Sequence, residues 1–301
     1  MAAEVAQLLV TDPDGCYLDL TVGGGGHLRA LAGRLGSGAR LYGIDRDSEA
    51  VARSALALEE TVQLRKIVKA TFGDLAEAVG QFEESLFSGI LLDLGLSSYQ
   101  LEDPSRGFSF RHDGPLDMRF DPTTGISATD LIGSLDEKRL TKLIREYGEE
   151  RQTARIAKAI VRERQKEVID TTGRLADIIV SVIRSPHQTK VLARVFQAIR
   201  IAVNRELDEL QRVLPAALEV LSSGGRLAVI AYHSLEDRIV KRFYQQEARG
   251  RCICPPGLPV CSCGSQPTMR IITRKGVAPR AEEISQNPRA RSARLRVAEK
   301  L

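Results

Sequence analysis

The sequence predicts an α/β fold in which a doubly wound parallel sheet is interrupted by an all-helical inserted domain. Short β-rich runs alternate with helical patterns over the first hundred residues, a long helical stretch follows, and the alternation returns after Gly224 and Gly225. Such alternation is typical of βαβ units around a parallel sheet. We therefore expect one α/β domain in two segments, residues 1–102 and 205–301, and a helical insertion at residues 103–204.

The individual elements follow from local patterns. Strands are expected, in chain order, at residues 16–20, 41–44, 62–68, 89–94 and 226–232, and helices begin near residues 27, 48 and 234. Within the insertion, apolar side chains recur every three or four positions from Leu192 to Leu214, which places one apolar stripe along a helix. Pro215 is expected to kink or restart that helix.

Composition excludes several classes of protein. The chain has 301 residues, of which 43% are apolar and 27% charged, so collagen-like, low-complexity and wholly disordered chains are excluded. No run approaches the roughly 20 apolar residues that cross a bilayer. The first basic residue is Arg29, so we expect no export signal at the start of the chain. We expect a soluble, cytoplasmic protein that has no membrane partner.

Charge is distributed unevenly although the net charge is only +4. Residues 1–100 hold 8 basic and 14 acidic side chains, residues 151–200 hold 11 and 4, and residues 270–301 hold 9 and 3. The two basic segments, the second of which we regard as a basic tail, are expected to follow a nucleic-acid backbone. Solvated helix faces and a mobile tail would give the same counts.

The strongest local signal is a glycine run between a strand and a helix. Gly23 to Gly26 follow Asp19 and precede His27, so the backbone can turn sharply and approach a ligand at the start of the helix. Asp45 ends the second expected strand, where a carboxylate can accept hydrogen bonds from both hydroxyls of a ribose. Together these features predict a cofactor that contains adenosine.

The details of the loop favour S-adenosylmethionine. Leu28 occupies the position at which the dinucleotide fingerprint has Gly or Ala, so a pyrophosphate is disfavoured. No Gly-Lys-Ser/Thr follows the loop, so P-loop nucleotides are disfavoured as well. Asp93 ends the fourth expected strand and should lie at the carboxyl edge of the sheet, where such ligands bind.

Nine sequence blocks, in order along nearly the whole chain, closely resemble the bacterial 16S ribosomal RNA cytosine-N4 methyltransferases (methyltransferase H). The blocks are GGGH at 24–27, GIDRD at 43–47, DLGLSS at 93–98, RGFSF at 106–110, GPLDMR at 114–119, EYGEER at 146–151, FQAIRI at 196–201, HSLEDRIVK at 233–241 and NPRARS at 287–292. The family's His-Pro-Ala-Thr-Arg block is replaced here by Lys-Val-Leu-Ala-Arg at 190–194.

This resemblance implies a class I S-adenosylmethionine-dependent methyltransferase whose helical insertion recognises the substrate. It implies N4-methylcytidine as the product and 16S ribosomal RNA within the small ribosomal subunit as the partner. The family's cofactor contacts fall on Gly25, Gly26, His27, Asp45, Phe72, Asp93 and Gln100.

Each of these cofactor contacts has a physical role. Phe72 can stack on the adenine and Asp45 can hold the ribose, while the glycine loop, His27, Asp93 and Gln100 can surround the methionine end. Ordinary core packing would explain Phe72 equally well, and a helix-start role would explain His27.

An exocyclic amine is a poor nucleophile because its lone pair is delocalised into the ring. Hydrogen-bond acceptors on its two protons turn the lone pair toward the methyl donor. We expect Asp93, or a carbonyl or hydroxyl group of Ser97 or Ser98, to be such an acceptor, which makes Asp93 and Ser97 catalytic candidates. A role for Asp93 in holding only the cofactor is the alternative.

The segment Arg106–Arg119 is expected to close over a splayed-out base, stack it on an aromatic ring and read its edge. Asp117, the third catalytic candidate, would recognise cytosine together with Arg119; a mutual salt bridge that only shapes the loop is the alternative. His233 is expected near the same cleft, although helix capping by Ser234 explains that block as well.

The sequence also allows other interpretations of its cysteines and of its function. Cys252, Cys254, Cys261 and Cys263 could bind a structural zinc ion or could be reduced thiols, and no metal is assigned to the active site. A methyltransferase of another nucleobase or of DNA, and a non-catalytic nucleic-acid-binding protein on the same fold, are the alternative functions. Whether the chain forms a homodimer is also open.

Overall fold

The computed structural model describes residues 1–184, 186–250, 254 and 263–301. The chain forms two compact units, one made of Met1–Gly95 and Asp208–Leu301 and the other of Leu96–Leu207. We call these the α/β unit and the helical unit. The insertion expected at residues 103–204 lies within the helical unit. In the described part of the chain, no helix is both long and apolar enough to cross a membrane.

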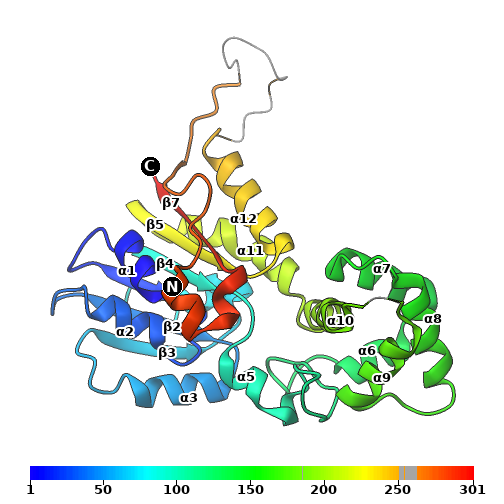
Figure 1. The fold of residues 1–301 in the computed structure, drawn as a ribbon. Coiled ribbons are helices and arrows are strands. Elements are labelled where there is room, and N and C mark those ends of the chain that lie inside the picture. Colours follow the sequence, from blue (N-terminus) through cyan, green and yellow to red (C-terminus); the bar gives the residue numbers. More distant parts are fainter. Residues whose placement is uncertain (185, 251–253, 255–262) are drawn as a thin grey trace. The chain divides into compact units, whose positions relative to one another are not determined.

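The α/β unit is built on a seven-stranded sheet (Figure 1). Its strands are β1 Cys16–Asp19, β2 Arg40–Asp45, β3 Leu64–Lys69, β4 Phe87–Asp93, β5 Leu221–Ala231, β6 Met269–Ile271 and β7 Arg294–Lys300. The order across the sheet is β3-β2-β1-β4-β5-β7-β6. Strands β1 to β5 pair in parallel, whereas β7 is antiparallel to both β5 and β6. The five expected strands are confirmed.

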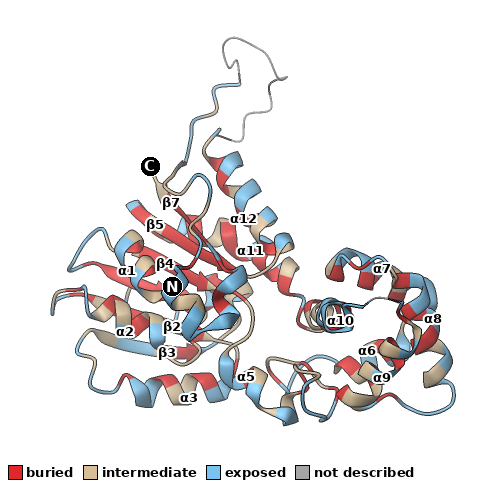
Figure 2. Ribbon diagram, in the orientation of Figure 1, coloured by how far each residue is buried: buried red, intermediate tan, exposed pale blue. Residues whose placement is uncertain are grey.

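Helices cover both faces of this sheet because successive strand residues point to opposite sides. Ile90 and Leu92 of β4 pack in one core with residues of α11 and α12, while Leu91 packs in a second core with residues of α1 and α2. Figure 2 shows the strands buried between these layers. The helices of the unit are α1 Ala2–Leu9, α2 Gly26–Ala32, α3 Ser48–Ala57, α4 Leu75–Val79, α11 Glu206–Glu219, α12 Ser234–Glu247 and α13 Ala281–Gln286, with 3-10 turns η1 Phe72–Asp74 and η3 Pro288–Ser292.

The end of the chain is a strand, so the expectation of a basic tail is wrong. Arg294–Lys300 forms β7, and its pairing with β5 and β6 satisfies the backbone. The side chain of Arg296 is only 10% exposed and donates two hydrogen bonds, of 2.6 and 2.9 Å, to the carboxylate of Asp237. Arg296 is therefore a structural cation of the sheet.

The helical unit has its own core. It contains α5 Ser98–Glu102, the 3-10 turn η2 Pro104–Arg106, α6 Ala128–Ser134, α7 Glu137–Gly148, α8 Thr153–Arg164, α9 Thr172–Val182 and α10 Gln188–Asn204. Leu140 of α7, Ile156 of α8, Ile179 of α9 and Ile199 of α10 are each fully buried in one cluster. An apolar stripe on each helix thus faces a shared interior.

The apolar stripe that the sequence assigns to one helix is divided between two, and the break does not lie at Pro215. α10 ends at Asn204 because Arg205 adopts a left-handed conformation (φ 53°). The Asn204 amide donates hydrogen bonds to the carbonyl oxygens of Met118 and Arg200 at 2.7 and 3.0 Å, which ties the helix end to a loop. Pro215 instead lies inside α11, where it lacks one helical hydrogen bond.

Candidate active site

Three carboxylates end three neighbouring strands at the carboxyl edge of the sheet. Asp19 is the last residue of β1, Asp45 of β2 and Asp93 of β4, and Tyr232 directly follows β5. Because β1, β2, β4 and β5 are parallel, these four side chains come from the same edge. In open α/β sheets, ligands bind outside this edge.

The glycine loop is tied to the end of β2. The backbone N–H of Gly23 donates to Oδ2 of Asp45 at 2.8 Å, and the N–H of Asp47 donates to Oδ1 at 2.9 Å. Gly25 precedes α2 in a left-handed conformation (φ 78°) that disfavours other residues. Burial raises the pKa of Asp45 despite the two N–H donors. Asp45 therefore fixes the loop and keeps lone pairs for a further donor.

Asp93 is held through both of its carboxylate oxygens. Nε2 of His27 lies 3.2 Å from Oδ2, and the phenol of Tyr232 donates to Oδ1 at 3.0 Å. The backbone N–H of Asp93 donates to Oγ1 of Thr21 at 2.6 Å. A carboxylate has about four lone-pair positions, so Asp93 can still accept hydrogen bonds from a substrate. Tyr232 was not among the expected site residues.

Asp19 lies fully buried behind this group. Its Oδ1 accepts hydrogen bonds from the backbone N–H and the hydroxyl of Thr21 at 2.9 and 3.3 Å. Burial raises the pKa of Asp19 to about 6, and the charge of His27 opposes the shift. Burial also lowers the pKa of His27, but the hydrogen bond and charge of Asp93 and the charge of Asp19 outweigh it, so the net shift is upward.

One buried oxygen at this edge fits a cationic ligand. Oδ2 of Asp19 has no hydrogen-bond partner within the described residues. Nδ1 of His27 has none either, but the protonated ring that Asp93 favours would donate there rather than accept. An unpaired buried polar atom costs about 1–3 kcal/mol. The α-ammonium group of S-adenosylmethionine is a donor of the kind that Asp19 lacks. At Gly26 an added Cβ would meet no atom within 4 Å, so the loop leaves open space there.

Phe72 and Gln100 have local contacts of their own. Phe72 begins the 3-10 turn that follows β3 and is half-buried against the core, which fits either of its expected roles. Ser97 and Gln100 belong to the helical unit and form a capping box at the start of α5. The Ser97 hydroxyl accepts from the Gln100 N–H at 3.2 Å, and the Gln100 side chain accepts from the Ser97 N–H at 3.1 Å.

Asp117 and Arg119 form the mutual salt bridge that we considered as an alternative. The Arg119 guanidinium donates to both oxygens of Asp117, the shortest bond being 2.6 Å. Burial raises the pKa of Asp117, but the Arg119 hydrogen bonds outweigh it and lower the pKa overall. Phe108, one of the aromatic residues of Arg106–Arg119, is buried, and its ring stacks on that of Phe120 with the centroids 5.5 Å apart. This ring is therefore not available for the expected stacking on a base.

The residue that caps α12 is His233, and not Ser234, for which capping was the alternative role. Nδ1 of His233 accepts from the Glu236 N–H at 3.4 Å, and the Glu236 carboxylate accepts from the N–H groups of Tyr232 and His233 at 2.8 and 3.3 Å. The side chains of His233 and Glu236 are 10% and 3% exposed. This capping box fixes the chain where Tyr232 leaves β5.

Comparisons with known proteins decide the family. The model of the MraW methylase family matches residues 1–301. The chain belongs to this family. It is 45% identical over 305 residues to a protein of Heliobacterium modesticaldum, covering 99% of this chain and 96% of the relative. It is 46% identical over 304 residues to a protein of Trichlorobacter lovleyi, with coverage of 100% and 97%. Both relatives are named ribosomal RNA small subunit methyltransferase H.

A third relative carries the same name. It comes from Thermomicrobium roseum and is 49% identical over 289 residues, covering 95% of the methylase and 88% of the relative. The resemblance inferred from the nine sequence blocks is therefore confirmed. The fold is that of a class I S-adenosylmethionine-dependent methyltransferase, and S-adenosylmethionine is its methyl donor.

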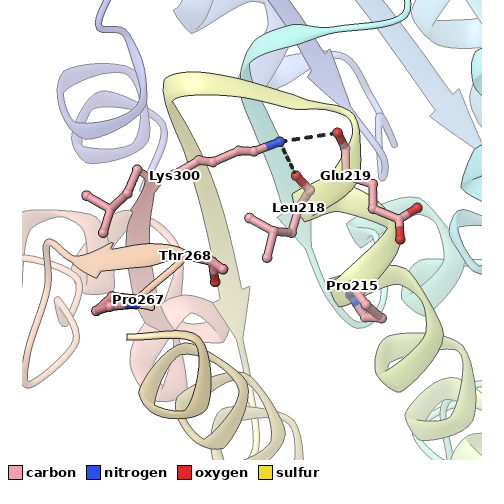
Figure 3. Close-up of a pocket in the computed structure, with 7 residues that line it drawn as sticks. Pro215, Leu218, Glu219, Pro267, Thr268 and Lys300 are labelled. Atoms are coloured by element: carbon pink, nitrogen blue, oxygen red, sulfur yellow. Dashed lines mark hydrogen bonds between the residues drawn. The ribbon is translucent and has the colours of Figure 1, made fainter. Parts of the chain in front are cut away.

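A pocket of 310 Å³ lies at the opposite edge of the sheet (Figure 3). Nζ of Lys300 donates to the carbonyl oxygens of Leu218, Glu219 and Leu221 at 2.8, 3.3 and 2.6 Å. An ammonium group has three donors, so all of them are engaged. Lys300 thus caps the end of α11 next to the start of β5, and the pocket belongs to the scaffold of the methylase.

The four clustered cysteines, for which zinc binding and reduced thiols were both considered, are only partly described. Cys252 and Cys261 lie outside the described residues, whereas Cys254 and Cys263 lie within them. In the part of the methylase that the structure describes, no group of three or more His, Cys, Asp or Glu side chains could hold a metal ion. The methyl-transfer chemistry derived below uses no metal.

Proposed function

We propose that this methylase transfers a methyl group from S-adenosylmethionine to N4 of a cytidine in the 16S ribosomal RNA of the small ribosomal subunit. The observation that carries the proposal is the identity of 45–49% over nearly full length to relatives named ribosomal RNA small subunit methyltransferase H. Ribosomal subunits are made in the cytoplasm of bacteria, so we also propose a cytoplasmic location.

The α/β unit would hold the cofactor at the carboxyl edge of the sheet. Asp45 would accept from the ribose hydroxyls, Asp19 would accept from the α-ammonium group, and Phe72 would pack on the adenine. Gly25 and Gly26 would let the backbone approach the methionine end. Bound in this way, S-adenosylmethionine supplies an electrophilic methyl group on a sulfonium ion.

Asp93 would orient the target amine. Its carboxylate would accept a hydrogen bond from one N4–H group, which turns the nitrogen lone pair toward the methyl carbon. Methyl transfer would leave the C–S electron pair on sulfur and one surplus proton on the nitrogen. The carboxylate of Asp93, which lies beside His27, would take up that proton.

Ser97 is the weaker acceptor candidate. Its hydroxyl oxygen already accepts from the N–H of Gln100, and its carbonyl oxygen accepts from the N–H of Leu101 at 3.2 Å. We therefore assign the acceptor role to Asp93 and give Ser97 and Gln100 the task of shaping the start of α5. Asp117 and Arg119 would recognise the base from the helical unit, to which we assign substrate recognition.

Mass spectrometry of ribosomal RNA nucleosides tests this function. RNA from cells with and without the gene is digested, and N4-methylated cytidines are quantified in the small and large subunits. The proposal predicts loss of one N4-methylcytidine signal from the 16S RNA and its return with the wild-type gene. An unchanged 16S profile, or loss of a different methylated base or of a DNA modification, would reject it.

A further inference from the structure

A cluster of cations surrounds the junction of α7 and α8 in the helical unit. Its anchor is Glu150, whose side chain is only 3% exposed. Oε1 of Glu150 accepts from the N–H groups of Arg151 and Gln152 at 2.7 and 3.0 Å, and Oε2 accepts from the Arg194 guanidinium at 3.2 Å. The side chain of Arg194 remains 50% exposed. The guanidinium of Arg194 is thus held in place by the buried Glu150 while half of the side chain is open to solvent.

The same junction is joined to the end of α9. Oε1 of Gln152 accepts from the backbone N–H of Arg184 at 3.1 Å and lies 3.4 Å from Nη1 of Arg155. Nη1 of Arg155 also lies 3.5 Å from the carbonyl oxygen of Val182. These contacts bring the start of α8 and the end of α9 together, so Arg155 and Arg184 lie beside each other.

The first half of α10 completes the cluster. Lys190 precedes Arg194 by four residues, so both side chains lie on one side of this helix. All the cations of the cluster are exposed. We call this surface the basic face, and it comprises Arg151, Arg155, Arg184, Lys190 and Arg194.

The basic face is poor in negative charge. Among the described residues, no carboxylate pairs with the side chains of Arg151, Arg184 or Lys190. The nearby carboxylates are the exposed Glu149 and the buried Glu150. Burial raises the pKa of Glu150, but its N–H donors and Arg194 outweigh burial and lower the pKa, so the anchor stays ionised.

The face also differs from its neighbours in composition. On α7, by contrast, two of the exposed cations have carboxylate partners, since Lys142 pairs with Glu146 and Arg139 with Asp136 at the N-cap. None of the exposed large apolar side chains among the described residues lies in α8, α9 or α10. Protein–protein interfaces centre on apolar and aromatic side chains. Cations without such anchors fit a phosphate backbone instead.

We propose that the basic face binds the phosphate backbone of the RNA substrate of this methylase. The proposal rests on the proposed function and adds to it the surface on the helical unit that positions the RNA. Arginine is suited to this task because its guanidinium can bond two phosphate oxygens at once. The anchoring of Arg194 by Glu150 and of Arg155 by Gln152 places their cations before RNA arrives.

A triple variant tests the proposal. Arg151→Gln, Arg184→Gln and Lys190→Gln are combined, which leaves the anchored pairs intact. Affinity for small subunits lacking the methylation is measured at several KCl concentrations, and methyl transfer is measured alongside. Each lost phosphate contact lowers the log–log salt slope by about 0.7–0.9, so the slope should fall by about 2 to 3. KM for the subunit should rise about tenfold or more while kcat is unchanged, because binding rather than chemistry is lost.

A matched variant removes the same number of charges elsewhere in the helical unit. It combines Lys138→Gln, Arg139→Gln and Lys142→Gln on α7. This control should keep the wild-type slope and KM. Affinity for S-adenosylmethionine, measured by calorimetry, should equal the wild-type value in both variants, which also shows that both fold.

The outcomes separate the two proposals. If the wild-type protein neither binds nor methylates the subunit, the proposed function is overturned, and with it the proposal that RNA binds the basic face. If the wild-type protein does both but the triple variant has the same salt slope and KM as the control, only the proposal that the basic face binds RNA is overturned. Lost affinity for RNA-free ribosomal proteins with an unchanged slope for RNA would also overturn it, in favour of a protein partner.

Discussion

The phenol of Tyr232 donates a hydrogen bond to Oδ1 of Asp93 over 3.0 Å, while His27 holds the other carboxylate oxygen. This bond links the first residue after β5 to the last residue of β4, which are neighbouring strands. Burial, followed by the charge of Asp93, raises the pKa of Tyr232, so the phenol stays protonated and remains a donor at every working pH. Tyr232 is thus a positioning residue for Asp93.

Tyr232→Phe should slow methyl transfer while leaving the fold intact. A hydrogen bond to a charged group is worth about 1.5–3 kcal/mol, which corresponds to roughly a 10- to 100-fold effect on rate. Single-turnover kinetics with saturating small subunits measures the loss. Affinity for S-adenosylmethionine should change much less than the rate.

Tyr42→Phe is the matched control for this variant. The Tyr42 hydroxyl is buried and has no hydrogen-bond partner in the described part of the chain. Its removal should leave the rate of transfer at the wild-type level. Equal rates for wild type, Tyr232→Phe and Tyr42→Phe would show that Tyr232 does not position Asp93.

Asp45→Ala should weaken binding of S-adenosylmethionine by at least about tenfold, because the ribose hydroxyls lose a charged acceptor worth about 1.5–3 kcal/mol per bond. The N–H of Gly23 also loses its partner, which loosens the glycine loop. Calorimetry measures the affinity. The exposed Glu60 serves as the control, since Glu60→Ala removes a carboxylate of the same unit without touching the site. An unaltered affinity in Asp45→Ala would remove Asp45 from the cofactor site.

Asp19→Asn should change how stability depends on pH. Burial raises the pKa of Asp19 from 3.8 to about 6, so the folded protein binds this proton more tightly than the unfolded chain does. The free energy of unfolding therefore loses a contribution as pH rises from about 4 to about 6, by up to roughly 3 kcal/mol at about 1.4 kcal/mol per pKa unit.

The measurement is denaturant unfolding of the cofactor-free protein at several pH values. Asp45 also has a raised pKa but is present in both proteins, so the difference between Asp19→Asn and wild type is what reports on Asp19. The stability of Asp19→Asn relative to wild type should increase across the window. A difference that is constant with pH would show that Asp19 does not carry the raised pKa.

Asp117→Ala should impair methyl transfer to the subunit by roughly 10- to 100-fold, since it removes a charged recognition partner. Cofactor affinity should be unchanged because Asp117 is not among the expected cofactor contacts. KM and kcat are measured with small subunits, and Tm is measured for the variant and the wild type. Together these values separate a role in recognising the base from a role in shaping the loop. A large drop in Tm with normal transfer at low temperature would mean that the Asp117–Arg119 pair only shapes the loop.

The strands and the glycine loop were predictable because their signals are local. The apolar run of β4 ends in Asp93, and a run of four glycines marks the start of α2. The spacing of apolar residues and the positions of turn residues were therefore enough to predict both features. β6 and β7 were missed because β6 has only three residues and β7 mixes charged with apolar residues, so neither gives a continuous apolar run. The role of Arg296 was hidden because its basic surroundings resemble a tail until its contact with Asp237, 59 positions away, is known.

Among the site residues, too, those with a local signal were predicted, and one recognised only by a distant contact was missed. Asp19, Asp45 and Asp93 were found because each ends a strand. Tyr232 was missed because its partner lies on a neighbouring strand 139 positions earlier, although its place directly after β5 was a usable signal. Base stacking was expected from an aromatic residue of Arg106–Arg119 because a loop rich in Gly and Pro is usually exposed, yet the ring of Phe108 is buried against Phe120.

The most direct test of the account is methyl transfer by the purified protein. It is incubated with S-adenosylmethionine labelled in the methyl group and with small subunits from cells that lack the gene, and the 16S RNA is digested to nucleosides. We expect the label in N4-methylcytidine alone, present with the wild-type protein and greatly reduced with Asp93→Ala. Label in another nucleoside, or equal labelling by Asp93→Ala, would contradict the central claim.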